Sequence, residues 1–118
     1  MKIIVAGSRS FNNYNKLKKE LNKFIEDFQL DREEITILSG GAKGADKLGE
    51  DYAILHKYKL IIIPAEWEIY GKSAGFIRNL EMAKIADACI VFWDGKSSGS
   101  QHMITLARKY KLLLRVIK

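Results

Sequence analysis

Three glycines, a lysine and an aspartate stand together in the stretch SGGAKGAD, which runs from Ser39 to Asp46 directly behind an apolar run. Glycines at a strand-to-helix turn expose main-chain N–H groups, which can bind a phosphate or carboxylate at the start of a helix. The spacing matches neither the GxGxxG fingerprint nor the Walker A motif, and glycines can equally be needed for close packing. The candidate ligand contacts in this stretch are Gly40, Gly41, Lys43, Gly44 and Asp46.

Two similar loops follow other apolar runs. In Gly7-Ser8-Arg9, glycine lets the backbone approach a ligand closely, serine offers a hydroxyl, and arginine offers a planar group of donors suited to phosphate. An ordinary loop with an exposed arginine would have the same residues. In the stretch from Asp94 to Ser100, glycines and hydroxyls lead into a helix, where Ser98 or Ser100 could act as the cap. The candidate contacts in the two loops are Gly7, Ser8, Arg9, Asp94, Gly95, Ser98 and Gly99.

The longest connection runs from Pro64 to Asn79. A loop of this length is costly to order unless its side chains pack or bind something. Trp67 has two open roles, in the core or stacked on a base, whereas Arg78 has no evident structural role in an otherwise apolar stretch. The candidate contacts here are Trp67, Tyr70, Lys72, Gly75, Arg78 and Asn79.

The elements that must position these loops alternate along the chain. Five apolar runs predict strands covered on both faces, at 2–6, 35–38, 60–63, 88–93 and 112–117. Between them, apolar residues three and four apart predict helices, the first over 14–28. This alternation predicts a single domain, residues 1–118, with a five-stranded parallel sheet between helices, a three-layer Rossmann-like α/β fold.

The placement of the unusual residues is asymmetric. Glycine-rich or positively charged loops follow the first four predicted strands, whereas the segments that enter the strands carry ordinary solvated charge. In open parallel sheets, ligands bind beyond the carboxyl ends of the strands, near the point where the strand order reverses. The sequence therefore predicts one site at that edge.

Composition narrows the class of protein. The net charge of +6 fits either solvated helix faces or a positive field that attracts anionic ligands or nucleic acid. No apolar run approaches the roughly 20 residues of a membrane span, and no signal-peptide pattern is present, so we expect a cytoplasmic protein. Cys89 is expected to be a buried, inert thiol, and His56 and His102 form no metal set. We expect no metal and no cofactor.

The motifs GSR, SGGAKGAD, EWEIYGKSAGFIRNLEM and ADACIVFWDGKSSGSQHMI resemble the YspA-type, cpYpsA-related branch of the SLOG superfamily, which is found in bacteria and phages. The superfamily takes its name from the Smf/DprA and LOG proteins, whose Rossmann-like domains bind nucleotides or nucleotide-derived ligands. The resemblance covers nearly the whole chain. It implies a nucleotide-related pocket formed by the candidate contacts named above.

The LOG relatives hydrolyse the N-glycosidic bond of nucleoside monophosphates and carry a PGGxGTxxE motif. Here Ser39 stands in place of the proline, one additional residue precedes Gly44, and Leu48 stands in place of the glutamate. A hydrolase would need another carboxylate. The candidates in order of preference are Asp46, Glu66, Asp94 and Glu50.

Three functions remain open from the sequence. Our main expectation is a small-molecule binder, a sensor or sequestering protein for a nucleotide, an ADP-ribose-like compound or a cyclic nucleotide signal. It could form a homo-oligomer, and we expect neither nucleic acid nor a membrane as its partner. The first alternative is a hydrolase of a nucleotide N-glycosidic or phosphate bond, and the second is a nucleic-acid-binding protein whose affinity falls steeply with salt.

Overall fold

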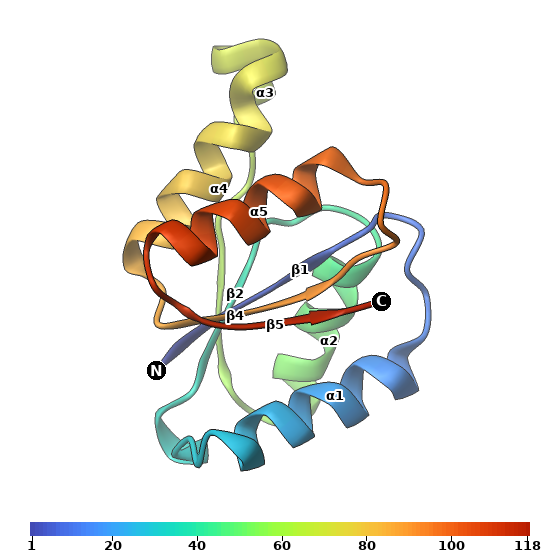
Figure 1. Cartoon of the computed structure of the whole chain (residues 1–118), viewed down its shortest axis with the longest axis vertical. Helices are drawn as coiled ribbons and strands as arrows, with labels where there is room; N and C mark the ends of the chain where they lie inside the picture. Colours follow the sequence, from blue (N-terminus) through green and yellow to red (C-terminus); the bar gives the residue numbers. More distant parts are fainter.

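In the computed structural model, which describes residues 1–118, five parallel strands form one sheet in the order β3-β2-β1-β4-β5 (Figure 1). The strands are β1 (Lys2–Gly7), β2 (Thr36–Ser39), β3 (Lys59–Ile62), β4 (Ala88–Phe92) and β5 (Leu113–Ile117). The central strand β1 is paired on both sides, with Ile4 opposite Leu38 of β2 and Cys89 of β4. The predicted parallel α/β architecture is confirmed, and the strand order reverses between β1 and β4.

Helices follow the strands in sequence. They are α1 (Tyr14–Asp27), α2 (Ala45–Leu55), α3 (Trp67–Tyr70), α4 (Ala74–Ile85) and α5 (Ser98–Lys109), with single 3₁₀ turns at η1 (Arg32–Glu34) and η2 (Gly71–Ser73). Asn13 caps α1 by accepting a hydrogen bond from the Lys16 N–H at 3.0 Å, which fixes where the helix begins. None of these helices has the length and apolar character needed to cross a membrane.

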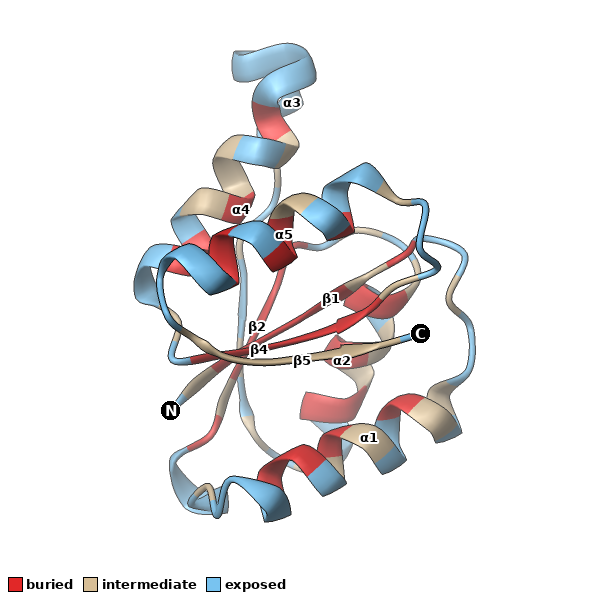
Figure 2. Ribbon diagram, in the orientation of Figure 1, coloured by how far each residue is buried: buried red, intermediate tan, exposed pale blue.

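Two apolar clusters hold the three layers together. Ile3 and Val5 of β1 pack against α1 and α2, whereas the alternate residues Ile4 and Ala6 pack against α4 and α5. All of β4 is buried in the same way (Figure 2). Cys89 on this strand is fully buried, as expected, and burial raises the pKa of its thiol.

The edge strand β3 departs from the prediction of strands covered on both faces. Its side chains Ile61 and Ile62 are 40% and 46% exposed. A continuous apolar run therefore did not indicate two covered faces here, because β3 lies at an edge of the sheet, where it pairs with β2 alone.

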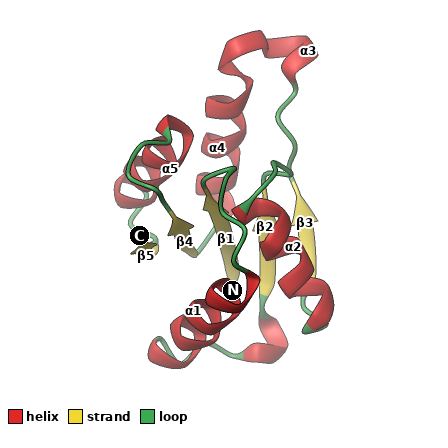
Figure 3. Cartoon of the chain, turned by 90° about the vertical axis from the view of Figure 1, so that its right-hand side faces the viewer, coloured by secondary structure: helices red, strands yellow, loops and turns green.

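The long connection after β3 folds into an arm. It contains α3, η2 and the first turn of α4, and it extends beyond the carboxyl edge of the sheet (Figures 1 and 3). Trp67, at the start of α3, is 51% exposed, so the alternative that places it in the core is wrong. The arm therefore forms one wall of the region beyond the carboxyl edge of the sheet.

Candidate functional site

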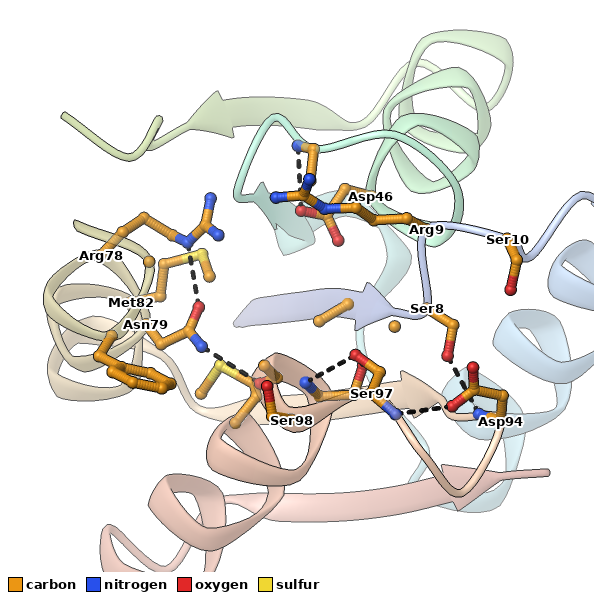
Figure 4. Close-up of a pocket in the computed structure, with 18 of the residues that line it drawn as sticks. Ser8, Arg9, Ser10, Asp46, Arg78, Asn79, Met82, Asp94, Ser97 and Ser98 are labelled. Atoms are coloured by element: carbon orange, nitrogen blue, oxygen red, sulfur yellow. Dashed lines mark hydrogen bonds between the residues drawn. The ribbon is translucent and has the colours of Figure 1, made fainter. Parts of the chain in front are cut away.

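A cleft of about 540 Å³ lies beyond the carboxyl ends of β1 and β4, at the reversal of strand order (Figure 4). Its walls come from the loops after β1, β2 and β4, from the arm, and from α4 and α5. The sequence thus located a real cavity at the predicted edge. The predicted contacts that line it are Gly7, Ser8, Arg9, Asp46, Trp67, Lys72, Gly75, Arg78, Asn79, Asp94, Ser98 and Gly99.

Other predicted contacts lie outside the lining of the cleft. They are Gly40, Gly41, Lys43, Gly44, Tyr70 and Gly95. Two N–H groups of the glycine-rich loop are bonded within the protein: the Gly41 N–H donates to Ser39 Oγ at 3.1 Å, and the Ala42 N–H donates to Asp46 Oδ2 at 3.2 Å. Oxygens of the protein thus occupy these two donors, and the interpretation of the loop as an anion cradle stays a prediction for its other N–H groups.

Two glycines of this loop, Gly40 and Gly44, lie in close contact with neighbouring groups. A Cβ on Gly40 would overlap the Arg78 guanidinium, and one on Gly44 would overlap the Ser8 carbonyl oxygen. Gly44 also has a φ of +79°, in the region that L side chains rarely adopt. The close-packing alternative explains both positions, and the loop acts by holding the cleft wall in place.

Arg78 connects α4 to the glycine-rich loop. Its Nη1 donates to the Gly40 carbonyl oxygen, and its Nε donates to Asn79 Oδ1 at 3.0 Å. The buried Asn79 in turn donates to the Gly99 carbonyl oxygen of α5 at 3.3 Å. The chain of contacts fixes the guanidinium at the cleft surface, where a planar donor can bind phosphate.

Asp46 lies buried at the same wall. Burial raises the pKa of this carboxyl to about 6, although the Ala42 N–H and the Arg78 charge act in the opposite direction. Burial likewise lowers the pKa of Arg78, and Asp46 opposes that change. The two side chains therefore carry opposite charges at neutral pH, and mild acid neutralises Asp46.

The loops after β1 and β4 are joined to each other. The Asp94 N–H donates to Ser8 Oγ at 3.0 Å, and the Ser8 N–H donates to the Phe92 carbonyl oxygen at 2.9 Å. Asp94 Oδ1 accepts from the N–H groups of Ser97 and Lys96, and these bonds lower the pKa of its carboxyl. Asp94 is therefore a fixed negative charge on the rim.

Ser97 caps α5 by accepting a hydrogen bond from the Ser100 N–H at 3.4 Å. The predicted caps, Ser98 and Ser100, are therefore wrong by one and three residues.

Sequence reasoning also missed several residues that line the cleft. Met82 follows Arg78 by four positions, so helical spacing alone could have placed it on the same face. The missed lining residues are Ala6, Ser10, Ala42, Phe76, Met82, Ser97, Ser100 and Met103.

The catalytic candidates are not gathered in one place. Asp46 and Asp94 line the cleft, whereas the exposed Glu66 precedes α3 outside the lining. Glu50 is buried below the cleft, where its Oε2 accepts from Ser39 Oγ at 2.6 Å. No group of three or more His, Cys, Asp or Glu side chains is placed to hold a metal ion.

Aromatic rings stand at the outer rim of the cleft. Trp67 and Phe76 line it and are 51% and 49% exposed. Phe76 is held edge-on against His102, with ring centroids 4.5 Å apart, and Tyr70, the last residue of α3, is 45% exposed. The cleft therefore combines three cations, Arg9, Lys72 and Arg78, with exposed aromatic surface.

The fold and this edge define a SLOG-type protein. The model of the YspA, cpYpsA-related SLOG family matches residues 1–70, more than half of the chain, and the chain belongs to this family. Among individual relatives, it is 36% identical over 81 residues to the Gene 61 protein of Mycobacterium phage D29, an alignment that covers 64% of this chain and 65% of that protein.

Two solved structures share the fold across almost the whole chain. One is DNA processing protein A from Helicobacter pylori, with a TM-score of 0.73, 22% identity, and coverage of 98% of this chain and 64% of that one. The other is DNA processing protein A from Streptococcus pneumoniae, with a TM-score of 0.74, 21% identity, and coverage of 99% and 50%. The chain thus spans less than two thirds of the length of each of these proteins.

The comparisons correct two expectations. We expected a small nucleotide-derived ligand acting as a signal, and we did not expect nucleic acid as the partner. The structural neighbours are DNA processing proteins, and the Helicobacter pylori structure is described by its single-stranded DNA binding mode. The main functional prediction is therefore wrong.

Proposed function

We propose that this protein binds single-stranded DNA along the cleft at the carboxyl edge of its sheet. The observation that carries the proposal is the pairing of fixed cations with exposed aromatic rings in one open cavity of about 540 Å³. Proteins that bind single strands combine these same two features, a positive groove for the backbone and aromatic platforms for the bases.

The cations supply the contacts to phosphate. Arg78 is held at the wall by Gly40 and Asn79, while the exposed Arg9 enters from the loop after β1. Ser98 and Gly99, in the first turn of α5, add main-chain N–H groups at a helix N-terminus, which favour anions. Such contacts position a strand without reading its sequence.

The aromatic rings favour a single strand over a duplex. Trp67 and Phe76 can stack only on bases whose faces are free, and in a duplex those faces are covered by the neighbouring base pairs. The net charge of +6 adds a general attraction for the backbone. We therefore expect binding that tolerates different sequences, prefers unpaired strands and weakens as salt rises.

The test is fluorescence anisotropy with a labelled oligothymidylate of about ten nucleotides, a length within the usual range of single-strand sites. Arg78→Ala should weaken binding about tenfold and lower the slope of log affinity against log salt by about 0.7, the loss of one phosphate contact. Lys84→Ala is the matched control, since this exposed cation lies in the last turn of the same helix and does not line the cleft.

Two results would count against single-strand binding at this cleft. One is equal or tighter binding of a duplex of the same length, which the stacking argument forbids. The other is identical affinity of the Arg78→Ala and Lys84→Ala variants, which would place the strand elsewhere on the protein.

A further inference from the structure

A second cavity, of about 240 Å³, opens where the ends of β4 and β5 meet the start of α1. It is smaller than the roughly 300–1,000 Å³ of ordinary small-molecule pockets, so it suits a fragment such as one base with its sugar. Its own lining residues are Phe11, Asn12, Lys16, Phe92, Trp93, Ile117 and Lys118.

Apolar and aromatic surface forms the floor of this second cavity. Phe11 and Phe92 pack with their ring centroids 4.9 Å apart. Trp93 is half-buried, and its Nε1 donates to the Ser97 carbonyl oxygen at 3.0 Å, which fixes the orientation of the indole. Phe92 is buried, so the rings that the cavity offers to a planar partner are those of the partly exposed Phe11 and Trp93, at little cost in side-chain entropy.

Two lysines, Lys16 and Lys118, line this cavity. The Lys118 ammonium lies 5.6 Å from the centroid of the Trp93 ring. Lys16 Nζ donates to the Lys118 carbonyl oxygen at 3.0 Å, and an ammonium has two further N–H donors to offer. An aromatic floor below cations repeats the character of the first cleft.

The two cavities are neighbours. Ser8, Ser10 and Asp94 line both, so the joined loops after β1 and β4 form a shared ridge between them. Figure 4 shows Ser8, Ser10 and Asp94 together at one end of the first cleft, opposite Arg78 and Asn79. A polymer that leaves the first cleft at this end passes directly into the second cavity.

We propose that the second cavity holds a further nucleotide of the same strand, with its base on the Trp93 side of the floor and its phosphate at Lys16. The inference rests on the proposed binding of single-stranded DNA and extends it to a track with a defined path, from Arg78 across the ridge to Lys16. Because the Asp94 carboxylate repels phosphate, the sugar or base of the linking nucleotide crosses the ridge.

The first measurement uses the two tryptophans of the chain. In Trp67→Phe, which keeps an aromatic ring at the arm, Trp93 is the single remaining tryptophan. Adding the same oligothymidylate of about ten nucleotides to saturation should change the emission of Trp93, because a base then covers the indole. Saturation removes any effect of the substitution on affinity.

The second measurement compares Lys16→Ala with Lys18→Ala. Both are lysines of α1, but Lys18 is exposed and does not line the second cavity. Lys16→Ala keeps the main-chain N–H that Asn13 caps, and it should lose about threefold to tenfold in affinity and about 0.7 in salt slope. Lys18→Ala should bind as the unaltered protein does.

The outcomes separate the two proposals. If the oligothymidylate fails to bind the unaltered protein, the proposed function is wrong and this inference falls with it. If it binds, and Arg78→Ala weakens it, the proposed function stands. In that case, an unchanged Trp93 emission, or equal affinities of Lys16→Ala and Lys18→Ala, would overturn the second nucleotide site alone.

Discussion

Replacing Asp46 by asparagine should stabilise the fold at neutral pH, although it removes a charge that faces Arg78. Burial raises the pKa of this carboxyl from 3.8 to about 6 in the folded protein, whereas in the unfolded chain it keeps the ordinary value. Between these values the folded state binds more protons than the unfolded state. Stability therefore falls as pH rises through this window, and it stays reduced above it.

The magnitude follows from the difference in pKa. A rise from 3.8 to about 6 is roughly two units, and at about 1.4 kcal/mol per unit the ionised carboxylate destabilises the fold by about 3 kcal/mol. The opposing attraction of Arg78 is already contained in the value of about 6. Asparagine does not titrate, and its Oδ1 can still accept from the Ala42 N–H.

The assay is urea unfolding of both proteins at about pH 4 and about pH 8. The stability of Asp46→Asn relative to the unaltered protein should increase by up to about 3 kcal/mol from the lower to the higher pH. Asp51→Asn, a change at a more accessible carboxylate of the same helix, provides the baseline. A difference between Asp46→Asn and the unaltered protein that is the same at both pH values would refute the reasoning.

Two further predictions follow from the same wall of the cleft. Binding of the oligothymidylate should tighten as pH falls through about 6, because neutral Asp46 no longer repels phosphate, and anisotropy should show no such dependence in Asp46→Asn. Gly44→Ala should cost more than about 3 kcal/mol in unfolding experiments, since its Cβ would overlap the Ser8 carbonyl oxygen. Gly95→Ala has a similar φ of +84° but open space, so its cost should be about 1 kcal/mol; equal losses would show that the overlap does not matter.

The sequence was informative about local structure because periodicity is a local property. Apolar runs and helical spacing placed every strand of the sheet and the four longer helices, with the first helix ending at Asp27, one residue before the prediction. The same patterns predicted where the cavity lies. Alternating strands and helices form a parallel sheet, and the loops that follow its strands all lie at the carboxyl edge. The sequence did not predict that side chains of β3 are exposed. A strand is an edge strand because of its place in the sheet, and the residues of β3 do not reveal that place.

The sequence by itself determined the parallel fold and the gathering of glycine, serine and arginine at one edge. Only the tertiary structure decided what those residues do there. Arg78 reaches the Gly40 carbonyl oxygen across 38 positions, and Ser8 joins Asp94 across 86, so no spacing pattern could reveal these two contacts. The physical reason is that buried polar groups must find partners, and for Arg78 and the Asp94 N–H those partners are brought within reach only by the packing of distant segments.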